Sequence, residues 1–468
     1  MLKSKFFKYG VGGVATPIIG VITIPLLSWF FSPNQLGEMN LFIVLITGIS
    51  LVFSFGLDQA LIRDYNSQNS TFLLLEILVF VSFFLLVLFF LASIFKKYLE
   101  CDFKLFYFDN LLEIISGAFF ILIIRFNMVI MRMEGHALSF SFTQIVRKFS
   151  VLTILFISVL LHVSQLGFPL LEPIYLQLTS VFITALFSFF FVRSKFKGFK
   201  YKRSYNLKKS LTFGWPLTIS GFLFWGLTSS DRILITFFNG VSELGVYSLA
   251  LSFSAVVTVI QAVFSTIWVP VVYKWYQGNA ESNFFYYTQK LVLLFLVLLF
   301  FLILMFSPLI EYLIPESYHG SLDVLAFVVF HPVFYMLSEV TGVGVNISRK
   351  TKLMIPIVLL SIFINLLLLF LLLDELGIVG AGISLAVAFF IYFLMKSMVS
   401  GYVTENKVGG SLHTYVISSL LLLVSFIYVY HDYILSLLLC FIVLCYTAYD
   451  FFMQPKLKEF IYEWKREV

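Results

Sequence analysis

Two arginines of this chain lie inside long apolar segments, where a charged side chain is costly unless it meets a ligand, a partner or water. Arg125 and Arg232 each carry a planar guanidinium whose paired N–H donors fit an oxyanion such as a phosphate group. Asn127 lies close to Arg125, and Trp225 and Asp231 accompany Arg232. An anion-binding site is one interpretation of these residues. The other is that Arg125 extends to the cytoplasmic interface, while Asp231 and Arg232 lock two lobes together or anchor a helix end.

Two acidic residues in apolar segments are candidates for binding a coupling proton or sodium ion. Asp58 is also placed to pair with Arg125, and Glu339 shares a predicted helix face with Tyr335. Lys396 lies so near the cytoplasmic end of its segment that we expect its ammonium to extend to the interface. The three cysteines indicate no metal site, and we expect no catalytic residues.

Hydroxyl and amide side chains form a stripe along one face of each of two predicted helices. The first stripe consists of Thr47, Ser50, Ser54 and Asp58, and the second of Ser254, Thr258, Gln261 and Ser265. Such stripes suit a polar, hydrated cavity, although the same residues could join one helix to another. We expect four of them to contact a polar ligand: Thr47, Ser54, Thr258 and Gln261.

Membrane-spanning helices must position all of these residues. With 60% hydrophobic and 12% charged residues, the 468-residue chain would expose too much apolar surface as a soluble domain. Most of its apolar segments hold about 20 residues or more, enough to cross a hydrocarbon core of about 30 Å. We expect an all-α polytopic membrane protein of about 14 transmembrane helices, near residues 10–31, 41–62, 73–95, 111–131, 140–161, 170–192, 211–238, 243–272, 288–314, 322–346, 353–373, 377–400, 411–430 and 432–453.

The basic residues indicate how these segments are oriented. If the N-terminus is cytoplasmic, most of the 31 basic residues fall on the cytoplasmic side, where Lys and Arg normally concentrate. The C-terminus is then cytoplasmic too. The net charge of +6 describes a face that meets anionic lipid, and we expect no nucleic-acid partner.

Similar sequences at the ends of the first and seventh segments indicate an internal repeat. Phe30-Phe31 and Leu36-Gly37 correspond to Phe237-Phe238 and Leu244-Gly245, with six segments between the copies. An even number makes the two halves parallel, so the lobes should be related by an axis along the membrane normal. We predict an N-lobe at 1–192, a basic cytoplasmic linker at 193–209, a C-lobe at 210–400, two further helices within 411–453 and an amphipathic cytoplasmic tail at 454–468.

Two short sequence motifs are similar to those of a known transporter superfamily. The run from Asp231 to Ile235, followed by the run from Leu244 to Ala250, resembles the polysaccharide-export branch of the multidrug/oligosaccharidyl-lipid/polysaccharide (MOP) exporter superfamily, in particular the O-antigen repeat-unit flippases. The segment from Gly10 to Pro25 and the turn at Leu36-Gly37 also look like that branch. The similarity in sequence covers a small part of the chain, whereas the similarity in predicted topology covers its whole length.

The resemblance implies a two-lobed, MATE-like core of six helices per lobe that alternates between inward-open and outward-open states. The implied cargo is an undecaprenyl-pyrophosphate-linked oligosaccharide for O-antigen, capsule or exopolysaccharide synthesis in the bacterial inner membrane. Arg125 and Arg232 would then bind the diphosphate, Trp225 would offer an aromatic surface to a sugar, and the polar stripes would meet sugar hydroxyls. Further expected partners are membrane lipids, a polysaccharide polymerase and a chain-length regulator, and we expect a monomer.

Several alternatives remain at this point. A MATE-type cation or drug antiporter would need an acidic cavity, and a lipid II flippase would share the fold. A membrane polysaccharide polymerase or ligase would need a sizeable outer loop, but the longest one, from Lys96 to Asn110, is short and lacks histidine. The sequence has no phosphate-binding Gly-x-x-x-x-Gly-Lys motif. We therefore expect a non-enzymatic transporter without cofactors, driven by a proton, a sodium ion or the membrane potential.

Overall fold

The computed structural model describes residues 2–65, 79, 82–84, 86–87, 89–91, 110–163, 170–193, 207–277, 282–405, 408–455, 457 and 459–461. The predicted segment at 73–95, the outer loop from Lys96 to Asn110, the basic linker at 193–209 and the tail at 454–468 lie largely outside these residues.

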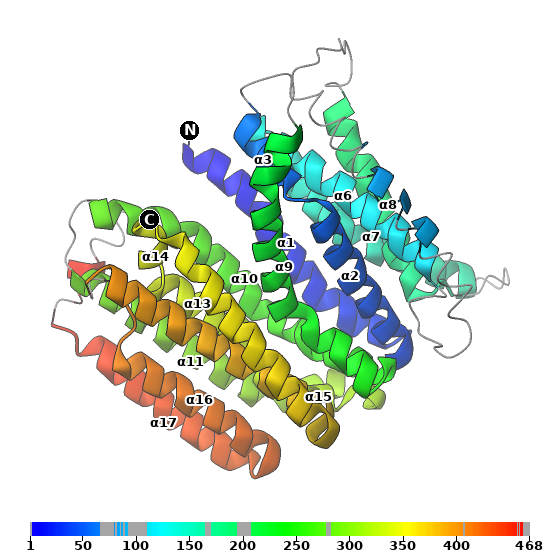
Figure 1. Cartoon of the computed structure of the whole chain (residues 1–468). Helices are drawn as coiled ribbons and strands as arrows, with labels where there is room; N and C mark the ends of the chain where they lie inside the picture. The colour runs from blue at the N-terminus through cyan, green and yellow to red at the C-terminus, as the bar shows by residue number, and fades with distance from the viewer. Residues whose placement is uncertain are drawn as a thin grey trace. The chain divides into compact units, whose positions relative to one another are not determined.

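Every regular element of the described residues is a helix (Figure 1). Helices suit a bilayer because each one satisfies its own backbone hydrogen bonds. Those up to residue 238 are α1 (Leu2–Ser28), α2 (Pro33–Phe53), α3 (Leu57–Asp64), α6 (Leu111–Met133), α7 (Ala137–Val163), α8 (Pro173–Val192) and α9 (Leu207–Phe238). The rest are α10 (Val241–Gln277), α11 (Ser282–Leu313), η2 (Glu316–Tyr318), α12 (Ser321–Val328), α13 (Phe330–Thr341), α14 (Gly344–Ile347), η3 (Thr351–Leu353), α15 (Met354–Val403), α16 (Leu412–Tyr430) and α17 (Tyr433–Phe452).

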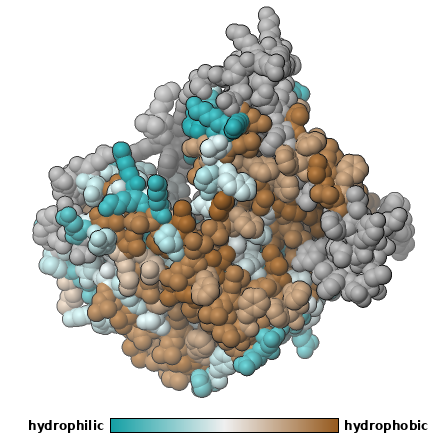
Figure 2. All heavy atoms as spheres, in the orientation of Figure 1, coloured by the Kyte–Doolittle hydropathy of each residue, from teal (hydrophilic) through white to brown (hydrophobic). Residues whose placement is uncertain are grey.

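The surface of these helices is suited to lipid. Among the described residues, ten helices are long and apolar enough to cross a membrane. Large apolar side chains such as Phe363 and Phe441 are exposed, 63% and 51% respectively. Apolar residues cover much of the coloured part of the face in Figure 2. An all-α polytopic membrane protein is thus confirmed, while the expected count of fourteen helices remains a prediction.

Two of the expected segments are the two halves of α15. The segments predicted at 353–373 and 377–400 both belong to α15, which is broken at Gly377. The backbone there has φ 54° and ψ −137°. Only glycine adopts such angles without strain, so Gly377 allows the chain to change direction between two apolar runs.

Contacts divide the chain into two compact units. Unit 1 comprises Met1–Ile19 and Asn34–Arg232, and unit 2 comprises Gly20–Pro33 and Ile233–Val468. Helices α1 and α9 therefore contribute to both units. The expected lobe boundaries at 1–192 and 210–400 remain predictions.

Unit 1 is held together by packing on α6 and α8. Helices α6 and α7 both pack against α8. One apolar cluster joins Phe42 of α2 to Ala118 of α6 and Val181 of α8. A second cluster joins Leu61 of α3 to Phe126 of α6. These contacts bring the start of α3 beside the middle of α6.

A break between α2 and α3 sets the position of Asp58. Residues 54–56 form a turn in which Phe55 and Gly56 have φ values of 48° and 63°. A Cβ atom on Gly56 would lie 2.2 Å from the carbonyl oxygen of Gly214 in α9, so the two backbones touch. The expectation of one unbroken helix at 41–62, with a continuous face from Thr47 to Asp58, is therefore wrong.

In unit 2, α13 packs against α15, α10 packs against α12 and α13, and α11 packs against α17. Stacked rings of Phe330, Phe334 and Phe393 fill the space around α13 and α15. The last two helices, α16 and α17, lie side by side (Figure 1). The interior of unit 2 is thus built around α13 and the second half of α15.

Candidate functional site

Arg125 and Asp58 form an ion pair inside unit 1. Nε of Arg125 donates to Oδ2 of Asp58 at 3.1 Å, and Nη2 lies 3.1 Å from the same oxygen. The Asp58 side chain is 5% exposed, whereas that of Arg125 is 32% exposed. The predicted pairing is confirmed. Because the arginine keeps a third of its surface exposed, part of its guanidinium remains accessible to another anion.

The two oxygens of the Asp58 carboxylate differ in their hydrogen bonds. Gln59 also donates to Oδ2, at 3.1 Å. Oδ1 is buried and accepts no hydrogen bond from the described residues. A buried carboxylate oxygen without a donor is costly, so Oδ1 is a place where a further hydrogen-bond donor would be stabilising. The predicted role of Asp58 in binding a coupling ion remains a prediction.

Asn127 lies between two helices rather than beside this pair. It is 2% exposed, and its Nδ2 donates to Oγ of Ser188 in α8 at 2.9 Å. Two residues along a helix correspond to a rotation of about 200°, so Asn127 points away from the face of Arg125. The bond favours a role in joining α6 to α8, and the predicted contact with a ligand stays untested.

The hydroxyls of the first stripe bond to their own helix. Oγ1 of Thr47 donates to the carbonyl oxygens of Ile43 and Val44 at 2.8 and 2.9 Å. Oγ of Ser54 donates to that of Leu51 at 2.7 Å. Such bonds occupy the hydroxyl hydrogen but leave acceptor capacity. Thr47 is partly buried, and Ser54 is buried.

The predicted site residues of α9 are packed into unit 1. Trp225 stacks on Phe222 with ring centroids 5.3 Å apart, and its indole covers Gly48, where an added Cβ would lie 2.5 Å from Cζ2. Asp231 is fully buried, and its Oδ1 accepts from the backbone N–H of Arg232 at 2.9 Å. Arg232 itself is partly buried. Trp225 therefore packs edge-first against α2, which leaves less of the ring for a sugar.

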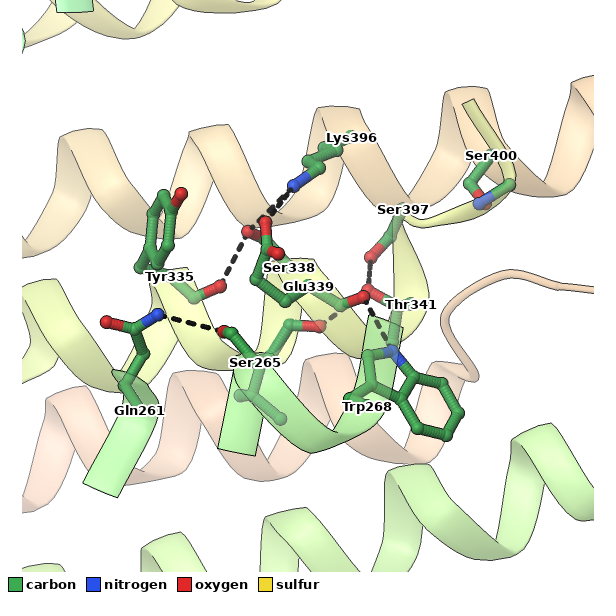
Figure 3. Close-up of polar contacts among 12 residues, drawn as sticks. Gln261, Ser265, Trp268, Tyr335, Ser338, Glu339, Thr341, Lys396, Ser397 and Ser400 are labelled. Carbon is green, nitrogen blue, oxygen red and sulfur yellow. Dashed lines mark hydrogen bonds and ion pairs between the residues drawn. The ribbon is translucent and has the colours of Figure 1, made fainter. Parts of the chain in front are cut away.

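Unit 2 contains a second ion pair, between Glu339 of α13 and Lys396 of α15 (Figure 3). Nζ of Lys396 lies 2.8 Å from Oε1 of Glu339 and 3.5 Å from Oγ of Ser338. Lys396 is only 3% exposed, and the Glu339 side chain is 18% exposed. The expectation that Lys396 extends to the interface is therefore wrong. Its ammonium is the counter-ion of Glu339.

The surroundings of this pair are shaped to hold the lysine. The rings of Tyr335 and Tyr392 are nearly parallel, and their centroids lie 5.8 and 5.5 Å from Nζ of Lys396. A Cβ atom on Gly342 would lie 2.5 Å from Cγ of Lys396, so glycine makes room for the stem. Trp268 of α10 donates to the backbone oxygen of Glu339 at 3.1 Å. The cation is thus enclosed by a carboxylate and two aromatic faces.

The second stripe lies on α10. Nε2 of Gln261 donates to Oγ of Ser265 at 3.0 Å, one turn further along the helix (Figure 3). Gln261 and Thr258 are both partly buried, and the helix is continuous across them. The expected helical face is present, and contact of these two residues with a ligand remains a prediction.

Two charged clusters were not singled out from the sequence. Arg147 and Lys148 lie near the middle of α7 and within the segment predicted at 140–161. Because they lie close to the predicted start of that segment, they were not recognised as charges within a spanning helix. Lys290 of α11 and Asp450 of α17 lie 2.7 Å apart, with His413 of α16 3.5 Å from Asp450. This second cluster ties the last two helices to α11.

Comparisons with known proteins define the family and the fold. The chain belongs to the polysaccharide biosynthesis protein family, whose model matches residues 2–275. No curated protein matches the chain. A solved structure of the lipid II flippase MurJ in an inward closed conformation is similar with a TM-score of 0.69 at 14% identity, over 95% of this chain and 98% of that one. An inward-facing MATE-family multidrug resistance transporter of the MOP superfamily is similar with a TM-score of 0.58 at 16% identity, over 85% and 96%.

At these identities the structural likeness shows a common fold and no more. The chain thus shares its fold with that lipid II flippase and that MATE-family transporter, and the expected MATE-like fold is confirmed to this extent.

Proposed function

We propose that this protein is a flippase that moves an undecaprenyl-pyrophosphate-linked oligosaccharide repeat unit from the cytoplasmic to the outer leaflet of the bacterial inner membrane. The repeat unit would serve O-antigen, capsule or exopolysaccharide synthesis. Both termini are cytoplasmic in this proposal, and the protein acts as a transporter rather than an enzyme. Membership of the polysaccharide biosynthesis family supports the substrate class, and the flippase-like fold supports transport by alternating access.

The observation that carries the proposal is the Arg125–Asp58 pair. An arginine in the middle of a spanning helix, with its charge only partly enclosed, indicates a polar environment at membrane depth. A lipid-linked glycan requires such an environment, because each sugar hydroxyl moved into hydrocarbon without a partner costs about 2–7 kcal/mol. The diphosphate would compete with Asp58 for the guanidinium of Arg125.

The driving force follows from the same charges. Two negative charges leaving an interior-negative cell gain roughly 4–5 kcal/mol per 100 mV of membrane potential. Glu339 and Asp58 each have a cationic partner, Lys396 and Arg125, but Asp58 also keeps a buried oxygen without a donor among the described residues. Asp58 is then the stronger candidate for binding a coupling proton or sodium ion, and the membrane potential alone is sufficient in principle. A polysaccharide polymerase and a chain-length regulator would act on the product.

The test is complementation in a strain whose own repeat-unit flippase is deleted. The wild-type protein should restore surface polysaccharide, and Arg125→Ala at equal expression should leave lipid-linked units on the cytoplasmic leaflet. Arg132→Ala is the control, because Arg132 is exposed in the last turn of the same helix. Restoration of a lipid II flippase deletion, or drug resistance without restored polysaccharide, would assign the protein to one of the alternative classes instead.

A further inference from the structure

Arg147 and Lys148 are adjacent cations in the interior of α7. The helix runs from Ala137 to Val163 and contains no acidic residue. Both side chains are partly buried, and neither forms an ion pair or a hydrogen bond with any of the described residues. Charges at membrane depth normally have a partner or line a hydrated path. Among the described residues, these two have no such partner.

The two cations do not face lipid. The exposed side of α7 is marked by apolar residues that recur at helical spacing: Leu138, Phe142, Phe149, Phe156 and Leu160. Arg147 is rotated about 200° from Phe149, and it lies one turn before Val151, which is fully buried. Lys148 lies two turns before Leu155, which is 2% exposed. Both cations therefore project from the half of α7 that faces the interior of unit 1.

Both cations lie well along α7 from its start, at a level that can be compared with that of Arg125. Arg147 lies ten residues after the start of α7, about 15 Å along the helix axis at about 1.5 Å per residue. Arg125 lies eight residues before the end of α6, about 12 Å from the same connection. The two helices are joined by a short turn at residues 134–136. Arg125, Arg147 and Lys148 consequently occupy a similar level of unit 1.

At this level of unit 1, basic side chains outnumber acidic ones among the described residues. Of the described residues placed at this level, Arg125, Arg147 and Lys148 are basic, and Asp58 pairs with Arg125. The remaining two positive charges match a group that carries about two negative charges. We propose that Arg147 and Lys148 bind the diphosphate of the lipid-linked glycan, and that Arg125 joins them when it releases Asp58. This inference rests on the proposed function for the identity of the ligand.

The chemistry of the two residues suits a diphosphate. The guanidinium of Arg147 offers two parallel N–H donors to one phosphate group, and the ammonium of Lys148 is a compact charge that can serve the other. Gln144 lies one turn before Lys148 and supplies an amide donor at the edge of the same face. Binding at α7 would break no ion pair with a described residue, since neither cation forms one there.

The experiment measures binding of inorganic pyrophosphate to the full-length protein in phosphatidylcholine nanodiscs by isothermal titration calorimetry. Arg147→Gln combined with Lys148→Gln should weaken binding at least roughly tenfold, which corresponds to about 1.4 kcal/mol. Exchanging the two residues, as Arg147→Lys with Lys148→Arg, should keep most of the affinity because both charges remain. The control is Arg349→Gln with Lys350→Gln, an exposed Arg-Lys pair in unit 2.

Two results would overturn the inference: unchanged pyrophosphate affinity in the Arg147/Lys148 double variant, or equal losses in the double variant and its control. Loss of pyrophosphate binding in nanodiscs that contain phosphatidylglycerol would also overturn it, because the site would then take lipid head groups. These outcomes are separate from the complementation assay. If no glycan is moved in cells, the proposed function fails, whatever the binding measurement gives.

Discussion

The ammonium of Lys396 and the carboxylate of Glu339 lie 2.8 Å apart on neighbouring helices of unit 2, and the lysine is almost completely buried. The pair joins α13 to α15 at the point where Gly342 leaves space for the lysine stem. A cation that belongs to the protein therefore occupies a place where a transported or coupling cation could otherwise bind. Unit 1 differs, because the carboxylate of Asp58 keeps one oxygen without a hydrogen-bond donor among the described residues.

Removing the built-in cation should destabilise unit 2. Lys396→Met leaves Glu339 buried without a counter-ion, and breaking such a pair costs about 3–5 kcal/mol. We expect a clear loss of thermal stability in detergent and recovery of most of it in the double variant Glu339→Gln with Lys396→Met. Sodium should stabilise Lys396→Met more than the wild type, because the vacated position can accept it. Equal melting temperatures for wild type and Lys396→Met would contradict the role of the pair.

Removing the acid of unit 1 should strengthen anion binding. Asp58→Asn leaves Arg125 without a charged partner, so pyrophosphate no longer competes with a carboxylate. We expect affinity for pyrophosphate to rise by up to roughly tenfold, about 1.4 kcal/mol. Asp64→Asn is the matched control, since Asp64 pairs with Arg63 at 2.7 Å instead. Calorimetry that shows no gain for Asp58→Asn, or the same gain for both variants, would exclude competition at Arg125.

The contact between Gly56 and Gly214 should tolerate no side chain. Gly56→Ala combines a positive φ, which costs an L-residue about 1–2 kcal/mol, with overlap that costs about 1–3 kcal/mol more. Gly135→Ala is the control: its φ is 75°, but an added Cβ would meet nothing within 4 Å. Thermal melts should show the larger loss for Gly56→Ala. A similar loss in both variants would mean that the helix contact adds nothing to stability.

The bond between Asn127 and Ser188 offers a test of whether Asn127 binds cargo or joins helices. A double-mutant cycle with Asn127→Ala and Ser188→Ala should give a coupling energy of about 0.6 kcal/mol, as is usual for such bonds within membranes. Complementation by Asn127→Ala should remain close to wild type if the bond is structural. Loss of complementation by Asn127→Ala, but not by Ser188→Ala, would instead support the predicted ligand contact.

The helices were predictable because apolar runs of sufficient length have few alternatives in a bilayer. One exception follows from two backbone positions: the positive φ at Phe55 and Gly56 divides one expected helix. That break leaves no hydrophobicity signal, whereas the kink at Gly377 falls between the segments predicted at 353–373 and 377–400. The boundaries between segments were therefore predictable only where polar residues mark them.

The candidate site was predictable in part for a similar reason. The pairing of Asp58 with Arg125 could be anticipated because an acid and a base placed in two apolar segments of one predicted lobe favour each other. The partner of Lys396 could not, since the lysine lies near a segment end and only the packing of α13 on α15 turns it inward. Arg147 and Lys148 were concealed in the same way, because the sequence does not reveal where the membrane begins along α7.

Helix α9 has a mechanical consequence. Its residues up to Arg232 belong to unit 1, where the backbone of Gly214 touches that of Gly56, and its residues from Ile233 belong to unit 2. A helix that is held by a backbone contact passes any displacement at that point to its neighbour. Movement of α9 at Gly214 would therefore shift the turn at residues 54–56 and, with it, the carboxylate of Asp58.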